Sequence, residues 1–307
     1  MKELLKLAVT KLPNKWQVYL NFRVRVGYFL SLKNPKGFNE KIQHRKLYDN
    51  NPLFTLCSDK LLVRQYVKDK IGEQYLIPLL YSGDNISIST LKSIESDYVV
   101  KTTHDSGGLC VVDKNKTNNY QQIKQILDRS LAHDFGKQVT EPWYSKIEPK
   151  IIVEKMLKGK DGGVPKDFKF HVYTKNGKQK IILNVDYDRF TDEHSRTYYD
   201  EELNILPFTW SCEKNYFKEL KEVANYQQML SLVKKLAEDF DYVRVDLYNV
   251  DGQIYFGELT FAPGSGFEPY CDKKYDFMLG DYWDYPKSKS KATHKQQKQT
   301  KYQSTTM

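Results

Sequence analysis

The chain of 307 residues is long enough for one large domain or two ordinary ones, and its 14% aromatic content indicates a folded body. Its formal net charge of +9 is unevenly distributed, because residues 287–307 contain six lysines and no acidic residue. Residues 1–286 therefore carry only +3 and show no basic stripe interleaved with aromatics, which argues against nucleic-acid binding. We expect the low-complexity terminal stretch to be a solvated, disordered tail, with contact to anionic lipid as the alternative.

The cysteines and the start of the chain bear on the compartment. Cys57, Cys110, Cys212 and Cys271 are widely separated, with no CxxC pair and no histidine at metal-binding spacing, which favours reduced thiols. Charged residues interrupt the apolar run at the N-terminus, so this run is neither typical of a signal peptide nor able to span a membrane. We expect a cytoplasmic protein, with the inner face of the membrane as a second location.

Residues 1–50 are predicted to be helical and basic, with a break at 34–37 before another helix opens at Phe38. Their apolar face consists of Tyr19, Phe22, Val26, Tyr28, Phe29 and Leu30. Such a face usually caps the main domain. The alternative is that, helped by Arg23 and Arg25, it docks on a membrane or on a partner protein.

Residues 57–80 predict a helix that is capped by Ser58 or Asp59 and ended by Gly72, followed by a short strand. Lys60 falls in the first turn of this helix, where a positive charge opposes the helix dipole. A phosphate bound at that terminus would reverse the sign of this interaction. Lys60 is therefore a candidate phosphate ligand.

Residues 97–113 predict a strand, a polar loop with two glycines at 102–108, and a second strand. Backbone N–H groups in a flap of this kind can hold phosphates, and Lys101 at the end of the first strand would reach them as a point charge. The GxxxxGK[ST] pattern of the Walker loop is absent. A plain hairpin with a glycine turn is the alternative.

A helix is predicted over 120–132, and a buried strand at 151–153 follows and ends in Glu154. A carboxylate in this position can accept a hydrogen bond from an adenine amino group, with Met156 and Leu157 as apolar walls. The alternative is an ordinary strand end that faces water.

Residues 164–190 predict two strands that carry a polar cluster. Asp167, Lys169 and His171 alternate with apolar residues and so share one face. Lys169 and His171 are candidate phosphate or substrate contacts, although a lone histidine is most often structural. Arg189, after the second strand, could clamp a transferring phosphoryl group.

Residues 213–240 predict a helix pair or one long helix, with 226–240 as its clearest part, and lead into a predicted hairpin at 242–248 and 254–261. Arg244 and Asp246 share one face of its first strand, and Glu258 and Thr260 share one face of its second. Two carboxylates that converge from a hairpin can hold Mg²⁺ against nucleotide phosphates.

The relative placement of the two hairpin faces is left open by the sequence. A strict two-residue turn at Asp251-Gly252 would put Asp246 and Glu258 on opposite faces of the sheet. A longer loop or a bulge would bring them together. An amphipathic hairpin whose charges are solvated is the alternative.

Five segments in this order resemble the ATP-grasp superfamily: SDK at 58–60, VVK at 99–101 with its glycine loop, IIVEKML at 151–157, VRVD at 243–246 and GELT at 257–260. More closely, from Asn34 to about Pro286 the chain resembles the TupA-like branch of teichuronopeptide biosynthesis and bacterial polysaccharide loci. The resemblance implies an α/β (α+β) fold whose two subdomains sandwich a nucleotide. It divides the chain into an N-terminal helical segment (1–50), a small α/β part (51–98), an ATP-grasp body (99–286) and the basic tail (287–307).

The resemblance implies ATP and Mg²⁺ as cofactors. Lys60 and Lys101 match the two phosphate-contacting lysines of the superfamily. The flap matches at Thr103, Ser106, Gly107 and Gly108. The adenine-binding segment of D-alanine–D-alanine ligase-like enzymes is matched by Glu154 with the backbone of Lys155 and Leu157.

The hairpin matches the catalytic and metal-binding part of the superfamily. Arg244 matches the arginine that steadies the acyl-phosphate and the developing oxyanion. Asp246, Glu258 and Thr260 match an Asp, Glu and Asn metal set, with Thr260 standing where asparagine is usual. A hydroxyl can still ligate Mg²⁺ directly or through water.

The implied reaction is ATP-dependent ligation, in which a carboxylate attacks the γ-phosphate and an amine then displaces phosphate from the acyl-phosphate. The implied partners are an amino acid or amine and a glycan or sugar-nucleotide carboxylate, such as a uronic acid of a capsule or O-antigen. Two other interpretations remain. One is a glycosyltransferase, with Asp186-Tyr-Asp188 as a DxD pair, or a sugar kinase; the other is a non-catalytic scaffold, suggested by Thr260.

Overall fold

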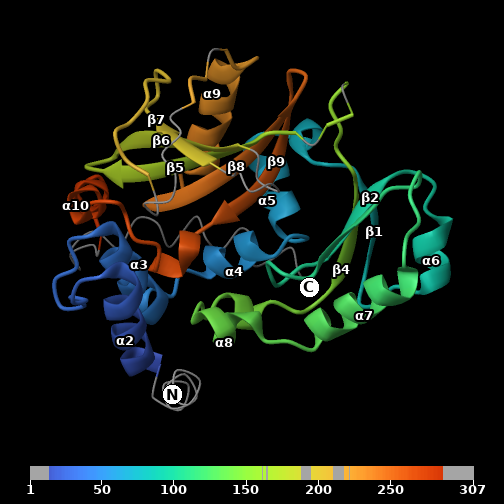
Figure 1. Cartoon of the computed structure of the whole chain (residues 1–307), viewed down its shortest axis with the longest axis horizontal. Helices are drawn as coiled ribbons and strands as arrows, with labels where there is room; N and C mark the ends of the chain where they lie inside the picture. The colour runs from blue at the N-terminus through green and yellow to red at the C-terminus, as the bar shows by residue number, and fades with distance from the viewer. Residues whose placement is uncertain are drawn as a thin grey trace.

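The computed structural model describes residues 14–160, 162–163, 165–187, 195–209, 218–220 and 222–285. Within these ranges lie two antiparallel sheets, one of four strands in the order β1-β4-β2-β3 and one of five in the order β7-β6-β5-β8-β9 (Figure 1). The strands are β1 (Leu79–Gly83), β2 (Tyr98–Thr102), β3 (Leu109–Val112), β4 (Ile151–Lys155), β5 (Asp167–Lys175), β6 (Lys178–Tyr187), β7 (Ser195–Tyr199), β8 (Tyr242–Val250) and β9 (Gln253–Thr260).

Helices surround both sheets, which confirms the predicted mixed α/β architecture with an N-terminal helical segment. They are α2 (Asn14–Val26), α3 (Phe38–Tyr48), α4 (Pro52–Ser58), α5 (Val63–Lys70), α6 (Ile88–Ser93), α7 (Tyr120–Leu131), α8 (Phe135–Val139), α9 (Tyr226–Leu236) and α10 (Lys273–Asp281), with short turns η1 (Glu73–Tyr75), η2 (Tyr144–Lys146) and η3 (Pro263–Gly266). No helix in the described part of the chain is both long enough and apolar enough to cross a membrane.

The four-stranded sheet forms the smaller lobe. Alternate residues of β2 are buried, and with Val153 of β4 and Leu127 of α7 they build a separate core. β1, which falls in the predicted 51–98 part, pairs with β4 from the predicted body. The domain boundary at 98 stays a prediction.

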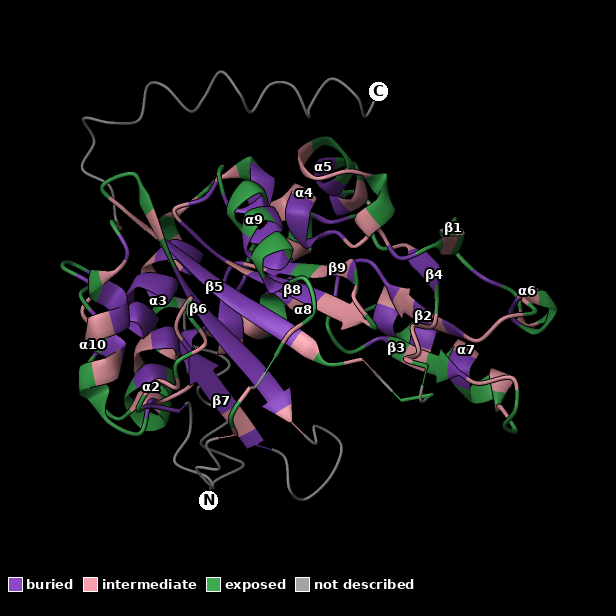
Figure 2. Cartoon of the chain, turned by 90° about the horizontal axis from the view of Figure 1, so that it is seen from above, coloured by how far each residue is buried: buried purple, intermediate pink, exposed green. Residues whose placement is uncertain are grey.

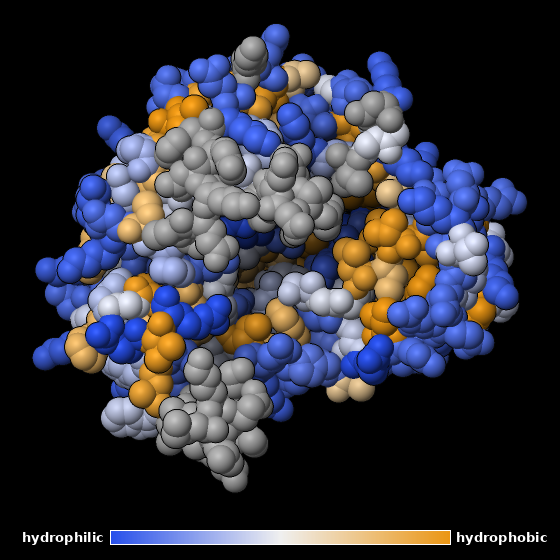
Figure 3. Space-filling view, in the orientation of Figure 1, coloured by the Kyte–Doolittle hydropathy of each residue, from blue (hydrophilic) through white to orange (hydrophobic). Residues whose placement is uncertain are grey.

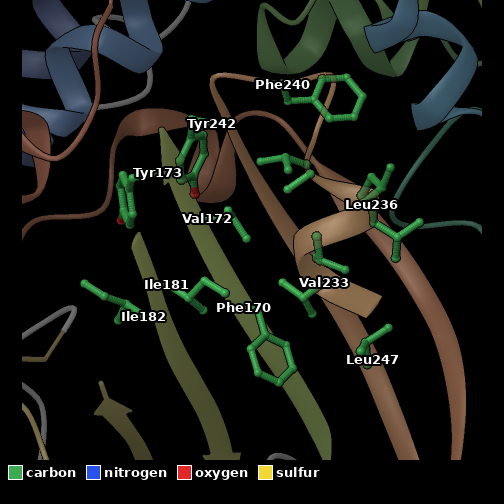
Figure 4. Packing of buried hydrophobic residues seen from close by; sticks show 14 of the residues in the cluster. Phe170, Val172, Tyr173, Ile181, Ile182, Val233, Leu236, Phe240, Tyr242 and Leu247 are labelled. Atoms are coloured by element: carbon green, nitrogen blue, oxygen red, sulfur yellow. The ribbon is translucent and has the colours of Figure 1, made fainter. Parts of the chain in front are cut away.

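The five-stranded sheet forms the larger lobe, and α9 covers one of its faces. Phe170 and Val172 of β5 and Leu247 of β8 lie near Val233 and Leu236 of α9 (Figure 4). The two-residue alternation of a strand explains this arrangement, because the polar residues between them must then face the other side of the sheet.

The β8–β9 hairpin settles the question of register that the sequence leaves open. Asp251 and Gly252 form a tight turn with φ angles of 51° and 90°, which pairs Val250 with Gln253. Between Asp246 and Leu247 the register shifts, because β9 carries an extra residue, Gly257, at this point. Asp246 therefore lies opposite Glu258. A Cβ atom at Gly257 would approach the Asp246 carbonyl oxygen to 3.0 Å. The tight turn and the bulge are therefore both present, and they put the two carboxylates together.

The segment around Lys60 differs from the prediction. The carboxylate of Asp59 accepts hydrogen bonds from the N–H groups of Leu61 (2.8 Å) and Leu62 (3.1 Å), and the helix begins only at Val63. These short-range bonds hold residues 59–62 as a turn between α4 and α5. Lys60 therefore precedes the helix and does not lie in its first turn.

Helix α3 binds the hairpin to the N-terminal segment through a buried arginine. The guanidinium of Arg45 is fully buried and donates to the carbonyl oxygens of Tyr242 (3.0 Å) and Phe261 (3.1 Å). It also pairs with Asp241, and it lies 4.5 Å from the ring centre of Trp283. Arg45 thus joins the start of β8 to the residue that follows β9. The capping role predicted for the N-terminal segment agrees with this contact.

Three predicted features lie outside the described residues. They are Arg189 with the neighbouring Asp188, Cys212, and the basic tail at 287–307. The cysteines within the described ranges, Cys57, Cys110 and Cys271, are free thiols, as predicted for reduced thiols.

We expect Arg45→Leu to lower the free energy of unfolding by about 3–5 kcal/mol, because it leaves Asp241 without its cation and two carbonyl groups without their donor. Urea denaturation at pH 7 measures this difference. The control is Arg129→Leu on the outer face of α7, which should change the stability by less than about 0.5 kcal/mol. Equal losses in both variants would contradict the role given to Arg45.

Candidate active site

A cleft lies where the smaller lobe faces strand β9, and the surface is hollowed between the two lobes (Figure 3). Its lining includes five of the residues predicted from sequence, Lys60, Lys101, Ser106, Glu154 and Glu258. These residues come from the α4–α5 turn, β2, the β2–β3 loop, β4 and β9. Elements far apart in sequence therefore meet in one cleft.

Glu154 lies between two cations at the base of this cleft. Its carboxylate oxygens are 2.7 Å from Lys101 Nζ and 2.9 Å from Arg64 Nη1. Each carboxylate oxygen has a second lone pair, so Glu154 can accept a further hydrogen bond from a ligand. Arg64 is absent from the predicted site residues, although it lies only four residues after Lys60.

Lys60 lies on the flap side of the cleft, and its ammonium group donates to the carbonyl oxygen of Asp105. Burial, with a contribution from the positive charge of Lys101, lowers the pKa of Lys60 to about 8. An anion bound between the ammonium groups of Lys60 and Lys101 would reduce the repulsion between them. The pair thus has the chemistry of a phosphate site.

The β2–β3 loop is held in place by a buried carboxylate. Asp105 accepts from Thr102 Oγ1 (2.7 Å), from the Gly108 N–H (3.1 Å) and from Ser130 Oγ on α7. Burial alone would raise the pKa of Asp105, but these hydrogen bonds outweigh it and lower the pKa. The loop is therefore fixed to α7 before any ligand binds. Asp105 is a second residue that the predicted site residues lack.

The predicted flap residues are placed unequally around the cleft. Ser106 lines the cleft, and Gly107 is exposed with open space around it. Thr103 is buried, and its N–H donates to the Lys150 carbonyl oxygen (2.9 Å). Gly108 is packed so closely against Ser130 and Thr102 that a Cβ atom has no room. Of these four residues, only Ser106 is among the cleft lining.

The hairpin brings its four predicted residues together around one guanidinium. Arg244 binds both oxygens of Asp246 at 2.7 Å through Nε and Nη2, and Nη2 is also 2.6 Å from Glu258 Oε1. Thr260 Oγ1 donates to the same Glu258 oxygen at 2.8 Å. Asp246 is buried, whereas the Glu258 side chain is 49% exposed and borders the cleft.

Asp246 and Glu258 share the single positive charge of Arg244, and their pKa values are shifted in opposite directions. Burial raises the pKa of Asp246, and the negative charges of Asp167 and Glu258 add to this effect against the pull of Arg244. For Glu258, whose side chain is half exposed, the effect of partial burial is outweighed by Arg244 and by the Thr260 hydroxyl, which lower its pKa to about 2. A cation at this pair would compensate the second carboxylate.

The donor set fits Mg²⁺, which prefers oxygen ligands and usually takes one or two carboxylates together with substrate phosphates. Asp246 and Glu258 supply two adjacent carboxylates, and the Thr260 hydroxyl lies beside them. Among the residues that the structure describes, no three histidine, cysteine, aspartate or glutamate side chains form a metal-binding group. The remaining ligands of a metal ion would therefore come from the nucleotide or from water.

Lys169 and His171 lie on the polar face of the large sheet but not in the cleft lining. Lys169 is buried, with its ammonium group 2.6 Å from both Asp167 and Asp186. Buried His171 contacts the Tyr242 hydroxyl at 2.9 Å through Nδ1, and burial, with Arg244, lowers its pKa well below the usual range. The charge of Lys169 is thus already compensated by two carboxylates, and the contact of both residues with the nucleotide stays a prediction.

The expected adenine-binding backbone is also partly committed elsewhere. The N–H of Lys155 donates to the Pro78 carbonyl oxygen and that of Met156 to the Asp97 carbonyl oxygen, both at 3.0 Å. Leu157 is not among the residues that line the cleft. The apolar residues that do line the cleft include Leu76, Ile77, Phe256 and Leu259, and the role of Met156 and Leu157 stays a prediction.

Two lobes built on antiparallel sheets, with lysines and a carboxylate pair facing one cleft, define the ATP-grasp class of enzymes. The TupA-like ATPgrasp family model matches residues 40–284. The chain therefore belongs to the TupA-like ATP-grasp family. No curated protein matches the chain in sequence.

Solved structures with a similar chain course are ATP-grasp ligases of low sequence identity. The D-alanine–D-alanine ligase of Helicobacter pylori is 15% identical with a TM-score of 0.42, over 80% of this chain and 68% of that one. The D-alanine–D-alanine ligase of Bacillus anthracis complexed with ATP is 15% identical with a TM-score of 0.37, over 74% and 62%. A RiPP-associated ATP-grasp ligase of Chryseobacterium gregarium in complex with ADP is 12% identical with a TM-score of 0.37, over 88% and 67%. The chain spans only 55% of the D-alanyl-alanine synthetase A of Vibrio cholerae.

We expect the affinity for MgATP to fall as the pH rises through about 8, because Lys60 then loses the proton that attracts phosphate. Isothermal titration calorimetry at pH 7 and pH 9 measures this change. In Lys60→Arg the guanidinium stays protonated at both pH values, so the fall should disappear. The same pH dependence in both proteins would contradict the assignment to Lys60.

We expect Asp105→Asn to weaken MgATP binding about tenfold, because the loop loses charge-assisted hydrogen bonds that are each worth about 1.5–3 kcal/mol. Equilibrium titration with ATP measures the dissociation constant. Asp128→Asn on the exposed face of α7 is the matched control and should bind as the wild type does. Wild-type affinity in Asp105→Asn would show that the loop needs no such support.

Proposed function

We propose that the protein is an ATP- and Mg²⁺-dependent ligase that joins an amino acid or amine to a carboxylate of a bacterial surface polysaccharide. The carboxylate would be that of a uronic acid, activated as an acyl-phosphate. The observation that carries this proposal is the meeting of Lys60, Lys101 and Glu154 with the Glu258 edge of the hairpin in one cleft. This arrangement provides cations for phosphates opposite a carboxylate pair for their metal ion.

In this proposal the nucleotide binds between the smaller lobe and the turn that joins α4 to α5. The ammonium groups of Lys60 and Lys101 contact the phosphates, and the fixed loop at Ser106 lies beside them. Glu154 accepts from the adenine amino group with its remaining lone pairs. Leu76 and Ile77 supply part of the apolar wall that a base requires.

The hairpin positions the reacting groups. Asp246 and Glu258 would hold Mg²⁺, with Thr260 as a direct or water-mediated ligand in the place of asparagine. Bound there, the metal would supply charge neutralisation for the transferred phosphoryl group. Arg244, held by both carboxylates, is placed to stabilise the negative charge on the acyl-phosphate and on the tetrahedral oxyanion.

The substrate class rests on the family and not on the cleft. TupA-like members are expected in polysaccharide loci, which favours a uronic acid of a capsule, an O-antigen or a wall polymer as the carboxylate. In that setting the enzyme would act on the cytoplasmic side of the membrane. Its second substrate would be an amino acid or another amine.

A glycosyltransferase is the weaker candidate for this cleft. Its DxD pair would need Asp186, but that carboxylate is buried between Lys169 and Arg196 and is not among the residues that line the cleft. A sugar kinase would use the same nucleotide cleft but would release ADP without free phosphate. A non-catalytic scaffold would keep the fold and lack ATP turnover.

Phosphate release from ATP tests the proposal. We expect release only when a uronic acid and an amine are both present, with one amide formed per phosphate. Arg244→Lys keeps the charge but loses the bidentate fork, so its kcat should fall about 10²–10³-fold while MgATP still binds. The control Arg129→Lys should retain wild-type kcat. A phosphorylated sugar without free phosphate would identify a kinase and contradict the ligase.

A further inference from the structure

Helix α2 carries a second row of apolar side chains on the side opposite to the row that packs against the body. We propose that this outer row and its neighbouring cations form a docking surface for an anionic lipid bilayer. The outer row consists of Trp16, Leu20 and Val24, and Phe29 follows it in the segment after the helix. This surface is separate from the nucleotide cleft and independent of the function proposed for it.

The inner row explains how α2 is attached. Val18 and Phe22, four residues apart, are 1% and 0% exposed and pack in a small core with Leu30, Leu32 and Phe267. This contact uses one face of the helix, as expected for side chains spaced by four. The attachment of α2 therefore requires none of the outer residues.

The outer row repeats the same spacing on the opposite face. Trp16 is 61% exposed, Leu20 45% and Val24 82%, and Phe29 is 81% exposed. A residue advances by about 100° around a helix, so these three positions fall within one arc of the surface. Large apolar groups gathered in this way mark an interaction site more often than scattered ones do. A helix that is apolar on two faces is expected to be covered on both.

The positive charge of residues 14–37 favours an anionic partner for this surface. Residues 14–37 contain no aspartate or glutamate, and their cations are all exposed: Lys15, Arg23, Arg25, Lys33 and Lys36. The guanidinium of Arg23 lies 4.9 Å from the ring centre of Phe29, so cation and apolar group share one surface. Tryptophan and arginine beside an apolar row fit the boundary between anionic headgroups and acyl chains.

A second copy of the chain fits this surface less well than a bilayer does. A two-fold contact through the outer row would bring two acid-free clusters of cations together, which is repulsive. An anionic bilayer instead complements Arg23, which lies beside the outer row, and meets no acidic residue in this segment. The cations need no particular geometry for this, because their long side chains can extend past the apolar row toward the headgroups.

The position of α2 keeps the cleft free. Figures 1 and 2 both place α2 at the end of the molecule away from α6 and the four-stranded sheet. Its inner row contacts Phe267, next to η3 and therefore on the larger lobe. A bilayer at this end would hold the larger lobe and leave the smaller lobe, with its flap, unhindered.

Co-sedimentation of the full chain with lipid vesicles tests the proposal. We expect binding to vesicles of 30% phosphatidylglycerol and 70% phosphatidylcholine, and at least tenfold weaker binding to pure phosphatidylcholine. Val24→Glu should reduce binding to the anionic vesicles at least tenfold, and Trp16→Ser, which changes no charge, should reduce it severalfold. Leu80→Glu is the control, because Leu80 is also exposed but lies on β1, and it should bind as the wild type does.

Three results would overturn the inference. The first is that the wild type does not bind anionic vesicles. The second is that Val24→Glu binds as the wild type does, which would assign binding to the lysines of the tail, since every variant retains them. The third is a dimer without vesicles that Val24→Glu dissociates, which would assign the surface to a second copy. Equal thermal midpoints of all variants establish that each is folded.

Discussion

The geometry of the candidate site depends on the guanidinium of Arg244, which is shared by two carboxylates. Arg244 binds both oxygens of Asp246 and one oxygen of Glu258, so these three side chains together carry one more negative than positive charge when both acids are ionised. A buried carboxylate is costly without a counter-charge, and Arg244 compensates only one of the two. The hairpin is thus built to accept a further cation next to the cleft. A divalent metal ion that accompanies nucleotide phosphates satisfies this requirement.

The rest of the fold holds this hairpin in place. The bulge at Gly257 aligns Glu258 with Asp246, and buried Arg45 on α3 ties together the two ends of the strands. Lys60, on the turn between α4 and α5, and Lys101 of β2 bring positive charge to the cleft, and Asp105 fixes the β2–β3 loop next to them. Positive charge from these two lysines and negative charge from Glu258 therefore meet in the cleft. An anion with a bound cation is the ligand that complements both.

Local patterns were enough to predict most of the strands, the glycine loop and the hairpin, because alternating apolar residues and glycine turns are local signals, but β7 was not predicted. The bulge was not predictable, since Gly257 occupies an ordinary place in an alternating strand and only the pairing with β8 exposes the extra residue. The ion pair of Lys169 with Asp186 was not predictable either, because a strand pattern shows which face a lysine is on but not which carboxylate lies beside it. Arg64 and Asp105 were missed for the related reason that their partners, Glu154 and Ser130, are distant in sequence.

Thermal stabilisation by MgATP of the wild type and of Glu258→Gln tests the central claim most directly, because a ligand that binds only the folded state raises the midpoint of unfolding by mass action. The account predicts a magnesium-dependent rise in the wild type that is lost or much reduced in Glu258→Gln. Glu238→Gln, outside the cleft on the end of α9, should behave as the wild type does. Equal stabilisation of wild type and Glu258→Gln, or none in the wild type, would contradict a nucleotide–metal site at the hairpin.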